Sequence, residues 1–380
     1  MKSSRLWGEA PWRRAKLMAR RGAIPSAPDV AIIGGGCTGL SAAYHLARRG
    51  LRPALFEANR IGSGASGCTG GIVLEGTASG PRAGARDCVP RLERLVADLG
   101  FDCELKLPGC WEIVHQVDTG GERLPWFDEG APISVARTVA GGSVEPGALV
   151  AGLAEAAVAA GAIIFEYRPV TRLALAAAPL VEVDGRKIHP ACVIVALNAW
   201  TTALIPQMPT VRSALTYACQ TAPLEKSTLA DLGLADQMPF YTADMPYLWG
   251  RICADRSLVF GAGLSYSEPH QFERLEVAHG ESAAILERLE RRVHALNPAL
   301  ASVPITARWA GPIAFREGLI PLLTRHRDAE NVLIAGAYAG HGVAFSVHAG
   351  ALMAAAIVDG ASLPSWGAPN LKSASASASH

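Results

Sequence analysis

The sequence predicts an α/β fold in which a Rossmann-type dinucleotide-binding domain is joined to a second, mostly antiparallel β-sheet domain covered by helices. Three observations predict it. A glycine-rich βαβ fingerprint lies near the start, a second glycine-rich turn from strand to helix lies near the end, and residues 211–312 have a more aromatic character. With 380 residues, the chain is long enough for two domains.

The fingerprint runs from Asp29 to Glu57. An apolar run at 30–33 predicts a buried parallel strand, and Gly34, Gly36 and Gly39 follow in the spacing G-x-G-x-x-G where a helix begins. The glycines permit a tight turn, close approach of a pyrophosphate and close helix packing, and the helix N-terminus favours the phosphates. Glu57 ends a second strand, predicted at 53–56. A carboxylate there accepts hydrogen bonds from a ribose and repels a 2′-phosphate.

The later elements continue the α/β pattern. Apolar periodicity predicts helices at 86–99, 149–159, 280–296 and 343–358. Strands are predicted at 103–107, 111–116, 162–166, 192–197, 258–261 and 331–335, with a hairpin turn at Asp184-Gly185. The segment 117–142 is interpreted as a polar, glycine-rich region.

The composition gives no indication of a membrane-spanning, nucleic-acid-binding or disulfide-rich protein. Apolar residues make up 50% and charged residues 18%, and no apolar run reaches the roughly 18 residues of a membrane-spanning helix. A formal charge of +1 gives no indication of nucleic acid or a membrane as a partner. The eight cysteines are scattered without a C-x-x-C pair, so small buried thiols in a reducing cytoplasm are expected, rather than disulfides or a metal site.

The two ends of the chain are interpreted separately. Residues 1–28 form a basic arm whose arginine pairs, Arg13-Arg14 and Arg20-Arg21, are not followed by the apolar region of an export signal. A solvated arm is predicted, with docking of the segment around Trp7 and Trp12 on the folded body or on a partner as the alternative. Residues 366–380 are predicted to form a disordered, low-complexity tail.

Two further glycine-rich segments indicate contacts with a flat ligand. The loop at 60–73 and the strand-to-helix turn at 336–344 both offer backbone that can approach a ligand closely. A flexible surface loop is the alternative for the first. The second is directed at a helix N-terminus, which suits an anionic or electron-rich ligand end.

Four segments taken together resemble the FAD-dependent amine and amino-acid oxidoreductases of the D-amino-acid oxidase type, a group that includes glycine oxidase and sarcosine oxidase. The segments are the fingerprint with Glu57, the loop 64–71, Asn198-Ala-Trp200, and Trp309-Ala-Gly-Pro-Ile together with 340–344. The loop and Trp200 are most similar to the γ-glutamylputrescine oxidase branch.

The resemblance implies one FAD that lies extended through the first domain. Residues 315–324 contain no cysteine, and Thr69 takes the place of an attached histidine, so the FAD is expected to be non-covalent. The implied cofactor contacts are Gly34, Gly36, Thr38, Gly39, Glu57, Arg60, Ala65, Ser66, Thr69, Gly70, Gly71, Val170, Asn198, Gly340, His341, Gly342, Val343 and Ala344. The implied FAD domain is discontinuous (29–80, 143–210 and 313–365), and the substrate domain comprises 81–142 and 211–312.

The implied reaction is oxidation of a C–N bond in a small amine or amino acid. A hydride passes to flavin N5, the imine hydrolyses, and O2 reoxidises the flavin to give H2O2. Since residues 258–263 lack the lysine that sarcosine oxidase places over its flavin, a dehydrogenase that uses a quinone or carrier is an alternative. The sequence is also compatible with a flavoprotein subunit of a larger complex, docked through the basic arm, and with an NAD-dependent dehydrogenase.

The substrate-side residues are less closely specified. Tyr247 and Trp249 are predicted as pocket walls, because aromatic faces attract an ammonium by about 0.5–2 kcal/mol. Pro312 stands where glycine oxidase has an arginine for the substrate carboxylate, so Arg316 and Arg251 are alternative candidates, unless each is an ordinary salt-bridging arginine. His341 and Tyr247 are the candidate catalytic side chains, although the Gly-His-Gly setting favours a backbone role for His341.

Overall fold

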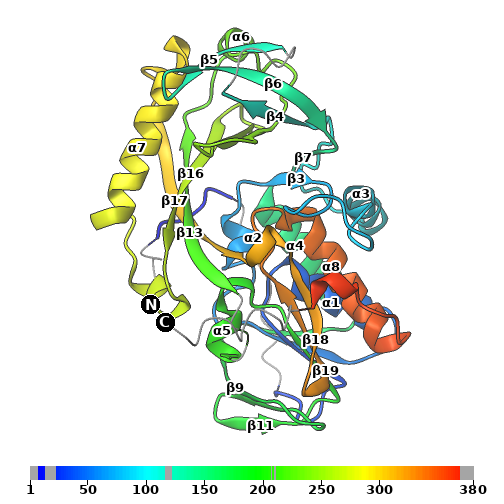
Figure 1. Ribbon diagram of the computed structural model, residues 1–380. Helices are drawn as coiled ribbons and strands as arrows, with labels where there is room; N and C mark the ends of the chain where they lie inside the picture. The colour runs from blue at the N-terminus through cyan, green and yellow to red at the C-terminus, as the bar shows by residue number, and fades with distance from the viewer. Residues whose placement is uncertain (1–6, 13–22, 116–121, 207, 209–210, 369–380) are drawn as a thin grey trace, which may run out of the picture.

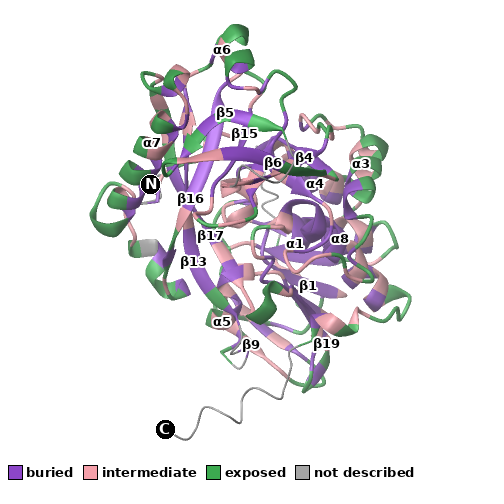
Figure 2. Ribbon diagram, turned by 45° about the horizontal axis from the view of Figure 1, so that its top comes forward, coloured by how far each residue is buried: buried purple, intermediate pink, exposed green. Residues whose placement is uncertain are grey.

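The computed structural model describes residues 7–12, 23–115, 122–206, 208 and 211–368 (Figure 1). A parallel sheet with its helices forms one half of the molecule, and a larger antiparallel sheet flanked by a long helix forms the other. Both sheets are largely buried, as Figure 2 shows. Among the described helices, none combines the length and apolar character needed to cross a bilayer.

The first sheet has six strands in the order β18-β19-β12-β1-β2-β8, all parallel to their neighbours except β18. The strands β1 and β12 lie at the centre of this sheet, and their residues are apolar and almost all buried. The sequence therefore predicted this sheet's core correctly. The strands are β1 Val30–Ile33, β2 Pro53–Phe56, β8 Ile163–Phe165, β12 Cys192–Val195, β18 Leu322–His326 and β19 Ala329–Gly336.

Helices with small residues cover this sheet. The structure places α1 at Cys37–Ala47, α4 at Pro146–Ala159 and α8 at Gly342–Val358, close to the predicted bounds, and α1 packs on both of the others. The helix α3, Cys88–Leu99, also packs on α8 and contributes Cys88, Val89 and Leu92 to the same core. This packing differs from the substrate domain in which the helix was expected, and the domain division stays a prediction. Its amphipathic face gave no information about which sheet it would cover.

The second sheet has eight strands in the order β17-β13-β16-β15-β14-β4-β6-β5. Neighbouring strands are antiparallel except β14 and β4. The helix α7, Gly280–Leu296, packs on β13, β16 and β5 and begins and ends at the predicted residues. The strands are β4 Cys110–Val114, β5 Arg123–Asp128, β6 Ala131–Val139, β13 Arg212–Thr221, β14 Phe240–Thr242, β15 Trp249–Ile252, β16 Leu258–Tyr266 and β17 Ile305–Phe315.

Three parts of the sequence prediction differ from the structure. The segment 122–142 contains β5, in which buried and exposed residues alternate, and β6, in which residues 133–135 are buried, and it is not a loop region. Residues 103–107 form only an isolated bridge at Lys106, because no neighbouring strand pairs with the rest. The strand β17 also continues to Phe315, past the expected domain boundary at 312.

Shorter elements complete the fold. The strands β3 and β7 pair with each other, and β9, β10 and β11 form a three-stranded sheet with the predicted hairpin turn at Asp184-Gly185. These elements are α2 Ala65–Cys68, α5 Thr201–Leu204, α6 Lys226–Asp231, β3 Ile72–Leu74, β7 Gly141–Ser143, β9 Val170–Ala174, β10 Leu180–Val183, β11 Arg186–Ile188, and five short 3-10 helices at Asn198–Trp200, Pro269–Arg274, Pro298–Leu300, Glu317–Leu319 and Ser365–Gly367.

The described part of the N-terminal arm packs on the folded body. Trp7 is 6% exposed and lies against Trp200 and Phe272, at ring-centre distances of 6.2 and 6.3 Å. The backbone N–H of Ala310 donates to the carbonyl of Trp7 over 2.8 Å. The prediction of a solvated arm is therefore wrong for residues 7–12, while both arginine pairs lie outside the described residues.

The C-terminal end is also packed for longer than expected. The indole of Trp366 donates to the carbonyl of Ala83 over 2.7 Å, and Gly367 is buried. The packed body therefore extends to Ala368, and the remainder of the predicted tail lies outside the described residues. All eight cysteines are free thiols, five of them buried.

A buried histidine makes stability depend on pH. Burial, with the nearby positive charges of Arg49 and His348, lowers the pKa of His45 to about 4. The unfolded chain takes up this proton near pH 6.5, whereas the folded protein does not until about pH 4. We therefore expect stability to fall as the pH drops from about 6.5 to about 4. The midpoint of thermal unfolding should fall less steeply in His45→Gln, and equal slopes in the two proteins would contradict this.

Candidate functional site

A cavity of about 2360 Å³ is lined by residues of both large sheets. Sites for drug-sized ligands are typically about 300–1,000 Å³. The cavity is therefore large enough for a long cofactor and a second molecule together. It extends from the ends of β1 and β2 to the face of the second sheet that carries Tyr241 and Trp249.

One end of the cavity is built around Glu57. Its carboxylate accepts hydrogen bonds from the backbone N–H of Gly35 over 2.8 Å and of Asn59 over 2.9 Å. These bonds fix the carboxylate at the carboxyl end of β2, where it lines the cavity. A fixed acidic group at this position fits the ribose of a dinucleotide.

The glycine fingerprint leaves no room for side chains. A Cβ at Gly39 would lie 2.0 Å from the carbonyl oxygen of Gly34, so this residue lets α1 pack on the turn. A Cβ at Gly36 would lie 2.9 Å from Oγ of Ser66, which accepts a hydrogen bond from the N–H of Cys37 over 3.0 Å. The fingerprint and the loop 62–71 therefore meet at Ser66, and both line the part of the cavity that suits a pyrophosphate.

Three side chains hold the carbonyl groups of the loop 68–70. The indole of Trp309 donates to the carbonyl of Cys68 over 2.8 Å, and that of Trp12 donates to the carbonyl of Thr69 over 3.0 Å. Nε of Arg251 donates to the carbonyl of Gly70, and its guanidinium lies 4.9 Å from the ring centre of Trp12. The loop is thus bound to the second sheet and to the N-terminal segment.

The second glycine-rich turn closes the other end of the cavity. The side-chain oxygen of Asn198 accepts a hydrogen bond from the N–H of Ala337 over 2.8 Å, and the hydroxyl of Tyr338 hydrogen-bonds to Thr38 over 2.7 Å. These bonds position the turn, so that α8 begins at the cavity wall. An N-terminus placed in this way favours negative charge on a ligand.

His341 is the titratable group of this turn. Its ring lies edge-on to Tyr241 at a centre-to-centre distance of 6.3 Å. Its Nδ1 is buried and finds no hydrogen-bond partner among the described residues. Burial lowers the pKa of His341, so the ring is neutral at physiological pH. Orphaned polar atoms at a cavity wall fit a ligand that supplies the missing bond.

Most of the residues implied as cofactor contacts line this cavity, and they stay predictions as contacts. Gly39, Gly71 and Ala344 do not line it and lie behind the wall. The lining residues are Gly34, Gly36, Thr38, Glu57, Arg60, Ala65, Ser66, Thr69, Gly70, Val170, Asn198, Gly340, His341, Gly342 and Val343.

The predicted substrate residues separate into two groups. Tyr247 and Trp249 line the cavity. Arg316 does not, because its guanidinium donates to the carbonyls of Pro321, Gly367 and Ala368, and its role as a substrate residue stays a prediction that this placement does not favour. Arg251 is 3% exposed and is held by the loop at Gly70, so it is a structural residue as well.

A row of side chains crosses the second sheet on its cavity face, and the sequence analysis identified only its last member, Trp249, as a site residue. Cross-strand pairs place Arg137 beside Glu112, Glu112 beside Tyr241, and Tyr241 beside Trp249. The indole of Trp249 then lies over Gly261, where a Cβ would be 2.0 Å from Cζ2. Each of these residues lies on a different strand, so spacing along the chain gave no signal of the row.

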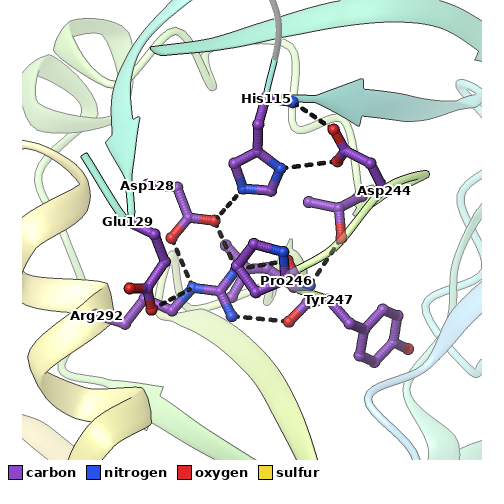
Figure 3. Close-up of polar contacts among 9 residues, drawn as sticks. His115, Asp128, Glu129, Asp244, Pro246, Tyr247 and Arg292 are labelled. Carbon is purple, nitrogen blue, oxygen red and sulfur yellow. Dashed lines mark hydrogen bonds and ion pairs between the residues drawn. The ribbon is translucent and has the colours of Figure 1, made fainter. Parts of the chain in front are cut away.

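A second group of side chains, which reaches the cavity through Arg292, was also missed (Figure 3). Arg292 of α7 donates to both carboxylate oxygens of Asp128 over 2.6 Å and to the carbonyls of Pro246 and Tyr247 over 2.8 Å. His115 lies between Asp128 and Asp244, at 2.8 and 2.7 Å. The group connects β4, β5 and α7 to the segment that carries Tyr247.

The group is buried and held by hydrogen bonds on several sides. Asp128 is buried, with its side chain 0% exposed, and Arg292 is 8% exposed. Both ring nitrogens of His115 lie within hydrogen-bond distance of a carboxylate oxygen, at 2.8 Å from Asp128 and 2.7 Å from Asp244. We conclude that this group fixes the wall segment 244–247.

Comparisons with known proteins agree with this geometry. A model of the family described as "DAO: FAD dependent oxidoreductase" matches residues 29–356. Gamma-glutamylputrescine oxidoreductase of Escherichia coli (strain K12) is 26% identical over 372 residues, which cover 86% of this chain and 82% of that protein. The glycine oxidase structure from Geobacillus kaustophilus has a TM-score of 0.69 at 20% identity, covering 88% of this chain and 95% of that one. L-proline dehydrogenase from P. horikoshii has a TM-score of 0.71 at 17% identity, covering 90% and 96%.

Proposed function

Because the chain belongs to the family of FAD-dependent oxidoreductases, we propose that it oxidises a carbon–nitrogen bond of a small amine or amino acid. FAD, when bound, supplies the electron acceptor for this chemistry. The observation that carries the proposal is a single cavity that joins Glu57 and the glycine fingerprint to an aromatic wall made by Tyr241, Tyr247 and Trp249. The names of the relatives above, which refer to glycine, L-proline and γ-glutamylputrescine, also support a substrate with an amine nitrogen.

The chain's own residues would prepare the substrate. Aromatic side chains at the wall exclude water, and a dry environment disfavours the charged ammonium, so more of the amine is neutral. Neutral amines carry the lone pair that oxidation requires. His341 and the N-terminus of α8 line the cavity close to Tyr241, and the helix N-terminus favours electron density on a bound ligand.

We propose O2 as the electron acceptor, with release of H2O2. A dehydrogenase that uses a quinone or carrier is the second candidate, because residues 258–263 of β16 contain no lysine to attract reduced oxygen species. A cytoplasmic location is part of the proposal, since eight free thiols suit a reducing compartment.

Anaerobic reduction tests the proposal. We expect the purified protein to carry FAD, and an amine or amino acid from a panel to bleach its visible absorbance in the absence of oxygen. Admission of air should restore the colour and release peroxide, whereas slow recovery that an artificial acceptor accelerates would assign the second candidate. The proposal of C–N oxidation would be overturned if only hydroxy acids reduced the flavin, or if none of the amines in a broad panel did.

A further inference from the structure

The N-terminal segment 7–12 precedes the dinucleotide-binding fingerprint in the chain, yet it reaches the loop at the aromatic end of the cavity. At its start, the carbonyl of Trp7 accepts a hydrogen bond from the N–H of Ala310 in β17, the edge strand of the second sheet. At its end, the indole of Trp12 donates to the carbonyl of Thr69 over 3.0 Å. The segment therefore connects the edge of the second sheet to the cofactor loop.

The ring of Trp12 is held by two neighbours. The guanidinium of Arg251 lies 4.9 Å from the ring centre, and the ring of Trp309 lies edge-on at a centre-to-centre distance of 5.6 Å. A cation over an aromatic face is attracted to it, and edge-to-face packing of two rings is also favourable. These contacts restrict rotation of the side chain and keep the indole N–H directed at the loop.

The bond from Trp12 fixes the direction of one peptide group. Because a trans peptide is planar, its carbonyl and its N–H point in opposite directions. The carbonyl of Thr69 points at Trp12, so the N–H of Gly70 points away from it. The N–H of Thr69 donates to the carbonyl of Ala65 over 2.9 Å, and that of Gly71 reaches Oγ1 of Thr69 over 3.4 Å. The N–H of Gly70 has no partner among the described residues.

This N–H lies where a ligand can supply the missing bond. Gly70 is buried and lines the cavity, and about 90% or more of buried backbone N–H groups are hydrogen-bonded. Its place on the loop indicates which part of FAD is concerned. Ser66 of the same loop meets the fingerprint, whereas a Cβ at Gly70 would lie 2.0 Å from Cζ3 of Trp249 in the aromatic wall. The N–H therefore belongs to the end where flavin and substrate meet.

We propose that Trp12 is a positioning residue for the cofactor, which directs the N–H of Gly70 at an electron-rich edge of the isoalloxazine of bound FAD. It acts through the peptide between Thr69 and Gly70. A hydrogen bond to a charged acceptor is stronger than one to a neutral acceptor. The N–H therefore stabilises the reduced flavin, which carries the added electrons, more than the oxidised flavin. This inference rests on FAD binding and not on the proposed amine oxidation.

The reduction potential of the FAD-loaded protein tests this inference without a substrate. Trp12→Phe keeps an aromatic ring beside Arg251 and removes the N–H donor. Its binding of reduced flavin should weaken about 10-fold more than its binding of oxidised flavin. We therefore expect a two-electron potential about 30 mV more negative than that of the wild type, measured against a redox dye. The variant should also release FAD more readily on dilution, followed by flavin fluorescence.

A similar indole bond outside the cavity provides the control. The indole of Trp366 donates to the carbonyl of Ala83 over 2.7 Å, and the guanidinium of Arg82 lies 6.0 Å from its ring centre. Trp366 does not line the cavity. Trp366→Phe loses the same kind of bond, but its reduction potential and its retention of FAD should equal those of the wild type.

Hydrogen exchange gives a second readout that needs no variant. In the FAD-loaded wild type, exchange of the Gly70 amide, resolved by mass spectrometry with fragmentation, should slow when dithionite reduces the flavin, because the bond strengthens. The same change should be smaller in Trp12→Phe. If Trp12→Phe does not fold, exchange in the wild type decides the question.

Three results would overturn the inference. They are a Gly70 amide that exchanges equally fast in both redox states of the wild type, a wild-type potential in Trp12→Phe, and equal shifts of the potential in Trp12→Phe and Trp366→Phe. The last result would show a general effect of lost stability. None of these measurements uses an amine, so the proposed C–N oxidation can fail while this inference stands, and the reverse also holds.

Discussion

Replacing Gly36 with valine is expected to give a folded protein that retains no FAD. Gly36 has φ −84° and ψ −178°, an extended conformation that valine adopts readily, so the substitution causes no backbone strain. A Cβ would already lie 2.9 Å from Oγ of Ser66, and the two methyl groups would extend into the space between the fingerprint and the facing loop. Loss of the pyrophosphate site removes the cofactor and with it the activity.

The ratio of flavin to protein absorbance after gel filtration measures this loss, and circular dichroism checks the fold. Gly50→Asn is the matched control. This glycine follows α1 and has φ +83°, and a Cβ there would meet no atom within 4 Å. Asparagine tolerates such a conformation, so full FAD content is expected. Stoichiometric FAD in Gly36→Val would contradict the placement of the pyrophosphate.

Features encoded by neighbouring residues could be predicted from the sequence. The fingerprint, the buried strands β1 and β12 and the helix α7 all have local signals, namely glycine spacing, apolar runs and helical periodicity. The family resemblance then indicated the cofactor. The strands β5 and β6 were missed because each contains a proline and charged or polar residues, which weaken the apolar pattern of a strand.

Contacts between distant segments could not be predicted. Asp128 and Arg292 are 164 positions apart, and only the packing of α7 on β5 brings them together. Arg316 lies near a family motif, which indicated a substrate contact, whereas in the structure its side chain donates to carbonyls of the C-terminal segment. Trp7 and Trp12 lie in a segment rich in basic residues. This composition predicted a solvated arm, although Trp7 is buried in the structure.

Replacing Arg292 with methionine is expected to lower the free energy of unfolding by about 3–5 kcal/mol, because it leaves the carboxylate of Asp128 buried without its main partner. The substitution keeps most of the side-chain volume, so the loss reports on charge and hydrogen bonds. It also removes the two bonds to the carbonyls of Pro246 and Tyr247, and KM should rise as this wall loosens. Urea denaturation and steady-state kinetics measure the two effects.

The double variant Arg292→Met with Asp128→Asn distinguishes an unpaired charge from lost packing. If the buried carboxylate causes the instability, removing its charge should restore part of the lost free energy, since a buried pair replaced on both sides costs less than a broken one. The exposed pair of Arg172 and Glu182 gives the reference, and Arg172→Met should cost less than about 1 kcal/mol. A double variant as unstable as the sum of its single changes would show that Asp128 and Arg292 act independently, and the wall segment would then need another anchor. The double variant could instead regain stability while its KM stays raised. In that case the bonds from Arg292 to the carbonyls of Pro246 and Tyr247 are the contacts that position Tyr247.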